Sequence, residues 1–262
     1  MIDLACLDDL LHLTRRLLTA PSPQEADALL SLPAHAIQIA PYRGVELSSG
    51  PRRHVGFVLR GMVSRYTQFR DGSRLVTALY LPGDFLGLDA LLGSTAISFD
   101  ALTEADILQI PAQQLGDAAR DHPRIMEALW RISAADAAMT REWLVNVGGR
   151  PAAKRVAYFL CEMAWRLSDE IPAGACAFQF PLAQTHIGDM LSLTPVHVNR
   201  MLKRLQAQGL VSISKPLVTV PSWERLVAYA GFSADYLFLA GPIDAFGGQP
   251  VGSNANGAAL SC

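Results

Sequence analysis

Residues 181–220 constrain the fold of this chain more than any other stretch, because they carry the signals of two short helices separated by a tight turn. An apolar helix is expected over about 183–191. Thr194 then stands where a helix N-cap belongs, and Pro195 takes the first helical position, where its missing N–H costs nothing. Gly209 ends the second helix, and two short β-rich runs beyond it can pair as a hairpin. This order of elements predicts a winged helix-turn-helix.

The second helix of this stretch has an apolar face and a basic face. Its apolar side chains recur at i, i+3, i+4 and i+7, and they are Val198, Met201, Leu202 and Leu205. The opposite face carries Arg200, Lys203 and Arg204, and residues 195–208 include no acidic residue. A face that is merely solvated usually mixes both signs of charge to gain i,i+4 pairs. We therefore expect this helix to enter a DNA major groove.

Three ordered motifs resemble those of the Crp/Fnr family of bacterial transcription regulators. Residues 55–87, with the Pro82-Gly83-Asp84-Phe85 turn, resemble the family's cyclic-nucleotide-binding-type β-roll. Residues 141–167 resemble its hinge and the first helix of its C-terminal domain. The third motif is residues 181–220, in which the sequence TPVHVNR resembles the recognition helix of a subgroup common in alphaproteobacteria, whose effectors are mostly unassigned. The resemblance covers about residues 30–230 and implies an α+β fold: a β-roll, a long dimerisation helix and a C-terminal winged helix-turn-helix.

Four segments are expected along the chain. They are a β-roll sensor domain with an N-terminal helix (1–118), a dimerisation helix and hinge (119–148), a winged helix-turn-helix DNA-binding domain (149–235) and a flexible tail rich in Gly, Ala, Ser and Asn (236–262). Gly148-Gly149 is expected to break the long helix and to supply the hinge.

The long helix predicted in the middle of the chain carries an apolar stripe with two interpretations. Ile125, Ile132 and Met139 recur every seven residues, with Leu129 and Trp143 alongside. The stripe can pack on the chain's own β-roll, or it can form a coiled-coil seam between two copies. The resemblance favours the second interpretation, so these five residues are the predicted homodimer interface.

Charge is distributed unevenly along the chain, whose net charge is −2. Residues 1–147 hold thirteen Lys and Arg against seventeen Asp and Glu, whereas the remainder holds nine against seven. Basic charge is therefore concentrated in the half that would bind DNA. Scattered cysteines, no signal peptide and no apolar run of bilayer length predict a cytoplasmic protein without a membrane partner.

The residues argue against two effectors that the resemblance implies, a cyclic nucleotide and an iron–sulfur cluster. Family members that bind a cyclic nucleotide use a glutamate and an arginine after the Gly-Asp-Phe turn. Here Leu88 stands at the glutamate position, and no Arg or Lys lies between Gly87 and Asp106. An iron–sulfur cluster needs four thiolates, and Cys6 is the only cysteine before residue 161. No cofactor is predicted, although haem on His12, His35 or His54, or an unidentified small effector, stays open.

The expected contacts with double-stranded DNA fall into two groups. Base edges are expected to be read by Val196, His197, Asn199 and Arg200. Arg200 matches the family's recognition arginine and would contact guanine bidentately, whereas Val196 replaces a common glutamate, so the half-site should differ from the usual one. Phosphates are expected at Gln184, Thr185, Thr194, Lys203, Arg204 and Lys215.

Two functions fit these features. One is a homodimeric transcription regulator that binds a near-palindromic site and contacts RNA polymerase if it activates. The alternative is an effector-sensing or scaffold protein of the same fold, with weak, non-specific and strongly salt-dependent DNA binding. An enzyme is not expected, because no nucleophile–base pair, metal-ligand spacing or phosphate loop is present.

Overall fold

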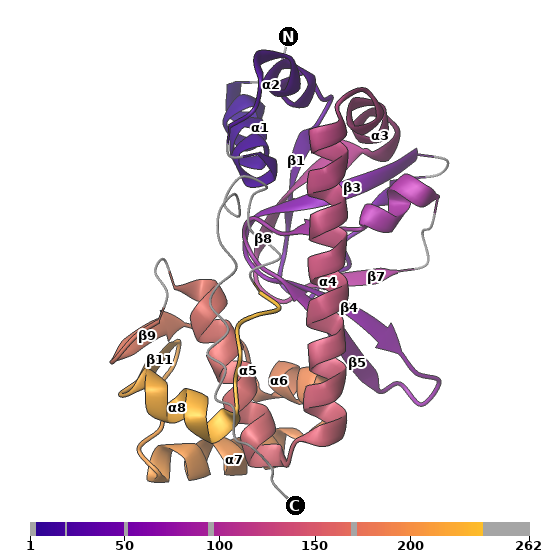
Figure 1. Ribbon diagram of the computed structural model, residues 1–262. Coiled ribbons are helices and arrows are strands. Elements are labelled where there is room, and N and C mark those ends of the chain that lie inside the picture. Colours follow the sequence, from indigo (N-terminus) through magenta and orange to yellow (C-terminus); the bar gives the residue numbers. More distant parts are fainter. Residues whose placement is uncertain (1–3, 19, 50–51, 94–96, 169–171, 238–262) are drawn as a thin grey trace, which may run out of the picture.

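The computed structural model describes residues 4–18, 20–49, 52–93, 97–168 and 172–237. A β-roll flanked by short helices is joined by one long helix to a helical C-terminal domain (Figure 1). The predicted tail of 236–262 lies outside the described residues, apart from its first two positions.

The β-roll consists of two antiparallel sheets. The first has the order β1 (His35–Ile39), β8 (Ala105–Pro111), β3 (Arg52–Arg60) and β2 (Ser48–Ser49), and β6 (Phe85–Leu86) also pairs with β3. The second has the order β5 (Arg74–Tyr80), β4 (Val63–Gln68) and β7 (Ser98–Ala101). The sequence predicted one strand over 101–110. In the structure Ala101 ends β7 and the rest of the predicted strand forms β8, which begins at Ala105 in the other sheet, so the chain crosses between sheets at 102–104.

Short helices cover the first sheet at its outer end. They are α1 (Leu4–Leu17), α2 (Pro23–Leu30), the 3-10 helix η1 (Leu88–Leu92) and α3 (Ala112–Asp121). Leu10, Leu13 and Leu17 of α1 are buried in one apolar cluster with Phe57 and Leu108 of the sheet. The start of α2 is fixed by a capping box, in which the Ser22 N–H donates to Glu25 Oε2 at 2.7 Å and the Ser22 hydroxyl accepts from Glu25 N.

Helix α4 (Pro123–Gly149) runs along the β-roll to the C-terminal domain (Figure 1). The predicted break at Gly148-Gly149 is wrong, because α4 includes both glycines and ends at Gly149, and the C-cap Arg150 has an extended backbone. A glycine costs a helix only about 1 kcal/mol. Pro151 follows directly, and the residue before a proline is driven out of the helical region. The change of direction therefore lies at Arg150-Pro151.

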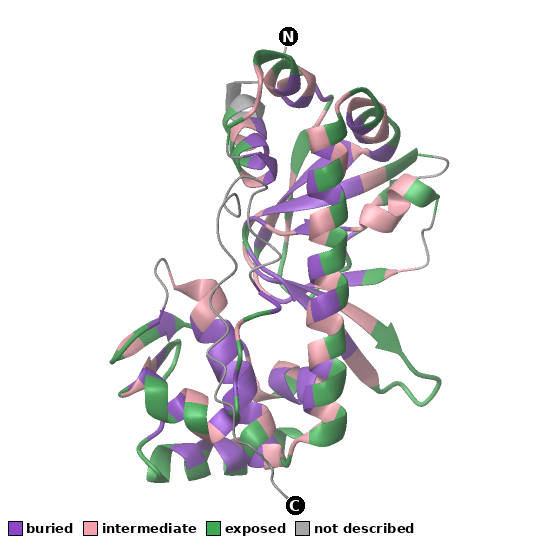
Figure 2. Cartoon of the chain, viewed as in Figure 1, coloured by how far each residue is buried: buried purple, intermediate pink, exposed green. Residues whose placement is uncertain are grey.

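The C-terminal domain is built around α5 (Ala152–Leu167), whose central residues 156–164 are all buried (Figure 2). Its other elements are β9 (Cys176–Gln179), α6 (Gln184–Leu191), α7 (Pro195–Ala207), β10 (Ser212–Ser214), β11 (Leu217–Val220) and α8 (Trp223–Ala230). The predicted wing hairpin is present as β10 and β11. Strand β9 was not predicted, and it pairs antiparallel with β11 to complete a three-stranded sheet.

Polar contacts join the two domains. Arg166 of α5 donates through Nη2 to the Leu79 carbonyl at 2.8 Å and to Asp84 Oδ2 at 2.7 Å, both in the β-roll. Arg166 also pairs with the buried Glu162, which accepts from the Trp143 indole. None of the described helices is long and apolar enough to cross a lipid bilayer.

Candidate nucleic-acid interface

The turn between α6 and α7 depends on a close approach of two backbone segments. Ser192 adopts a left-handed conformation with φ 52°, and Leu193 N donates to the Gly188 carbonyl at 3.0 Å. A Cβ added at Gly188 would lie 2.4 Å from the Leu193 carbonyl oxygen. Glycine at this position therefore lets α6 and the turn approach closely enough to set the angle of the recognition helix.

Helix α7 begins and packs as its sequence predicts. Thr194 is the N-cap, and its hydroxyl oxygen accepts from His197 N at 3.2 Å, while Pro195 occupies the first turn. The four apolar side chains of its inner face are all buried: Val198, Met201, Leu202 and Leu205. Their burial fixes which side of α7 faces solvent.

The outer face of α7 is basic and open to solvent. Arg200, Lys203 and Arg204 are exposed, and within the described chain none of them forms an ion pair. Val196 is 80% exposed, an unusual position for a branched apolar side chain. Of the other predicted contacts, Thr185, Thr194 and Lys215 are exposed, whereas Gln184, His197 and Asn199 are half-buried. The structure thus places all ten predicted residues on α6, α7, the α7 cap and the wing, with none of them wholly buried.

Lys154, which was not predicted as a contact residue, lies in a groove beside α7 together with two residues that were, His197 and Arg204. The groove has a volume of about 460 Å³ and is lined by Lys154, His197, Arg204 and Tyr229 together with 151–153. Lys154 is exposed in the first turn of α5, whose N-cap Pro151 supplies no side-chain hydrogen bond. Free N–H groups at a helix N-terminus favour a phosphate. The available signal was a lysine three residues after a proline, in the first turn of an apolar helix.

The predicted dimer residues need a correction. Ile125 and Leu129 are 0% and 2% exposed in the core of the sensor domain, and Trp143 packs with α5, where its indole donates to Glu162. Ile132 and Met139 are half-buried against the same cores. This stripe therefore packs within the chain, which was the other interpretation of its spacing. The large apolar side chains that α4 exposes are Trp130, Leu144 and Val145, at 70%, 72% and 49%.

The cavity between the β-roll and α4 carries more negative than positive charge. It measures about 250 Å³, and its lining includes Leu88, Asp89 and Asp136. Arg65, the one arginine among the described lining residues, is already paired with Asp136 at 2.7 Å and also donates to Thr140. Burial and the nearby Asp136 raise the pKa of Tyr80, whose hydroxyl donates to the same carboxylate at 3.1 Å. Among the described lining residues, a phosphate placed here would meet two carboxylates and no unpaired cation.

Comparisons with known proteins agree with this architecture. The Crp-like helix-turn-helix domain matches residues 154–229, and the cyclic nucleotide-binding domain matches residues 49–122, so the two family models together span more than half of the chain. The "Anaerobic regulatory protein" of Aggregatibacter actinomycetemcomitans is 28% identical over 182 residues, which cover 68% of this chain and 70% of that protein. The "Regulatory protein HlyX" of Actinobacillus pleuropneumoniae is 28% identical over 177 residues, or 66% and 72% of the two chains.

The fold has close counterparts among solved structures. FixK2 from Bradyrhizobium japonicum is 25% identical with a TM-score of 0.66, over 76% of this chain and 98% of that one. TTHB099 from Thermus thermophilus, a transcriptional regulator of the CRP family, is 21% identical with a TM-score of 0.60, over 74% and 96%. The β-roll, the long helix and the helix-turn-helix therefore occur together, and the chain belongs to the Crp/Fnr family of DNA-binding transcription regulators.

Proposed function

We propose that this regulator is a homodimer that reads a specific, near-palindromic DNA site through α7 and requires neither a cyclic nucleotide nor an iron–sulfur cluster. The observation that carries the proposal is the outer face of α7, where three exposed basic side chains lack ion-pair partners among the described residues. Basic side chains on a short capped helix fit the negative potential of a major groove. Acting on chromosomal DNA, the protein would work in the cytoplasm, and activation would need a contact with RNA polymerase.

The residues proposed to contact DNA fall into two groups, those that read bases and those that bind phosphates. Arg200 lies on the exposed face two turns from the end of the helix, and it reads guanine O6 and N7 bidentately, a contact worth about 1–3 kcal/mol of discrimination. Val196 offers only methyl groups, which suit a thymine methyl, while His197 and Asn199 add hydrogen-bond donors and acceptors for base edges. Phosphates are held by Gln184, Thr185, Thr194, Lys203, Arg204, Lys215 and, in the groove beside α7, Lys154.

The dimer seam is the outward stripe of α4. Its exposed residues recur at alternating intervals of four and three: Trp130, Ala134, Ala137, Arg141 and Leu144. That spacing averages the 3.5-residue repeat of a coiled coil, and its alanines let two helices approach closely. A two-fold axis along α4 would place the two α7 helices on half-sites about 34 Å apart.

Independence from a cyclic nucleotide rests on the cavity between the β-roll and α4. Arg65 bridges β4 to Asp136 of α4, and Tyr80 donates to the same carboxylate, so the chain's own side chains already make the connection across the cavity. A ligand phosphate would have to displace a partly buried ion pair.

Selection of bound sequences from a random double-stranded library, with purified protein and no added ligand, tests this proposal. Enrichment of a palindromic motif is the expected result. If no motif is enriched, with or without added cell extract, and only weak, salt-dependent binding is measured, the protein acts as a sensor or scaffold of the same fold.

A further inference from the structure

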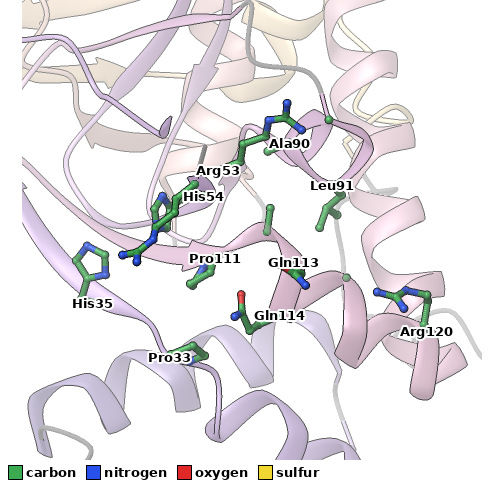
Figure 3. A pocket seen from close by; sticks show the side chains of 14 residues that line it. Pro33, His35, Arg53, His54, Ala90, Leu91, Pro111, Gln113, Gln114 and Arg120 are labelled. Carbon is green, nitrogen blue, oxygen red and sulfur yellow. The ribbon is translucent and has the colours of Figure 1, made fainter. Parts of the chain in front are cut away.

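A second and larger cavity lies on the outer side of the sensor domain, remote from α7. It measures about 870 Å³ and opens between the start of β3, helix η1, the start of β1 and helix α3 (Figure 3). Five of its lining side chains are basic or can become so: His35, Arg52, Arg53, His54 and Arg120. None of the described residues that line it is acidic.

The positive charge of this cavity comes mainly from two arginines. Arg52 and Arg53 are exposed, and neither forms an ion pair with a described residue. Arg120 is partly neutralised by Asp117, one turn away on α3. Burial and the adjacent His35 lower the pKa of His54, which disfavours the charged form of its imidazole. The cluster stands out because the sensor half of the chain is acidic overall.

Hydrogen-bond donors converge on the cavity from separate elements. Figure 3 shows Arg53 from β3 beside Ala90 of η1, Arg120 at the far end of α3, and Gln113 and Gln114 between them. The Arg53 guanidinium lies close to Gly93, where an added Cβ would be 3.0 Å from its Nη1. Guanidinium groups bind phosphate and carboxylate groups through paired N–H donors, and amides add neutral donors.

We propose that this cavity is a binding site for a small, multiply charged anion bearing phosphate or carboxylate groups. Like charges held near one another repel, and an anion of this class would relieve that repulsion while using the donors that now face solvent. The site is separate from the cavity between the β-roll and α4, and it does not depend on how α7 reads DNA.

The position of the site connects it to the rest of the molecule through η1. Ala90 and Leu91 line the anion cavity, whereas Leu88, Asp89 and Leu92 line the smaller cavity that faces α4. Helix η1 therefore contributes residues both to the anion cavity and to the cavity that faces α4. An anion held by Arg53 would fix the outer side of η1 and thereby its position against α4, the helix that leads to the DNA-binding domain.

Isothermal titration calorimetry of the full chain with pyrophosphate and, separately, citrate tests the proposal and distinguishes the two ligand chemistries. The double variant Arg52→Gln, Arg53→Gln should weaken binding about ten- to a hundredfold, as expected for losing hydrogen bonds to a charged group. Arg70→Gln removes an exposed arginine from the same domain, outside the cavity, and should leave binding unchanged.

Circular dichroism of each variant checks that the fold is kept. Saturable binding of either anion that is lost in the double variant alone supports the site, and the anion that binds names the ligand chemistry. Absence of saturable binding by both anions would overturn the proposal, as would equal weakening in Arg70→Gln, which would indicate general charge attraction.

Discussion

The ion pair between Arg166 and Asp84 joins the DNA-binding domain to the sensor domain, and Asp84→Ala is predicted to loosen that junction. The Arg166 side chain is only 10% exposed and that of Asp84 20%, and their 2.7 Å contact is charge-assisted. Burial disfavours the guanidinium charge, but Asp84 and Glu162 together raise the pKa of Arg166. The substitution removes one of the two carboxylates that compensate this charge.

The expected cost follows from what remains around Arg166. Stranding a buried charge without any partner costs about 3–5 kcal/mol. Glu162 and the Leu79 carbonyl still contact Arg166 in the variant, so losing the Arg166 contact costs about as much as one hydrogen bond to a charged group, about 1.5–3 kcal/mol. The Leu81 N–H, which donates to Asp84 Oδ2 at 2.9 Å, loses its acceptor as well and adds to this cost. Asp117→Ala removes the carboxylate of an exposed pair with Arg120 and should cost less than about 1 kcal/mol.

Urea unfolding followed by tryptophan fluorescence measures both costs, and a double-mutant cycle with Arg166→Met isolates the coupling. The coupling between positions 84 and 166 should be about 1.5–3 kcal/mol, well above the 0.3–0.5 kcal/mol within which independent sites add. Additive effects, or a cost for Asp84→Ala no larger than that of Asp117→Ala, would show that this ion pair does not hold the two domains together.

Three further predictions address the fold and the assembly. Burial works to raise the pKa of Glu25, but hydrogen bonds with Ser22 and the charge of the nearby Arg124 lower this pKa overall. The Glu25 carboxylate therefore stabilises the fold above the unfolded-state pKa of about 4.3, and this stabilisation is lost as the pH falls through the folded-state pKa. The thermal midpoint of Glu25→Gln should therefore lie below that of the wild type at neutral pH and approach it below about pH 4, whereas a constant gap would contradict this assignment. Gly188→Ala should destabilise the chain by more than about 1 kcal/mol and weaken DNA binding, because its Cβ would meet the Leu193 carbonyl. The control Gly149→Ala, whose Cβ meets nothing within 4 Å, should stabilise the chain by about 0.5–1 kcal/mol. Equal thermal midpoints for the two variants would count against the close turn. Leu144→Glu should yield monomers in sedimentation velocity, because it places a charge on the exposed stripe of α4. Phe69→Glu changes an exposed apolar side chain away from α4 and should keep the wild-type assembly. A dimer that survives Leu144→Glu would place the dimer interface elsewhere.

Local patterns made the recognition helix predictable from the sequence. The cap at Thr194, the proline at 195 and the inner stripe of α7 each depend on residues fewer than eight positions apart, and the structure agrees with all of them. The wing hairpin was predictable for the same reason. Strand β9 was not, because its partner β11 lies about forty residues further along the chain and only three-dimensional pairing defines it.

Longer-range relations could not be predicted for physical reasons. A repeat of seven on α4 identifies an apolar stripe, but the same spacing suits a helix buried against its own domain, as Ile125 and Leu129 are. The repeat therefore did not determine what covers the stripe. The pair of Asp84 with Arg166 and the cationic cavity combine residues from distant segments, and no local pattern of charge marked them.

Binding titrations on a selected site and on single-base variants of it would show whether α7 reads DNA through Arg200. Arg200→Ala should lose about 1–3 kcal/mol of discrimination at one symmetric pair of base positions and keep the other preferences. Lys203→Ala is the matched control, and it should weaken binding to every sequence alike while lowering the salt slope by about one. Unchanged base preference in Arg200→Ala, or uniform weakening in both variants, would contradict the assignment of Arg200 as the base reader.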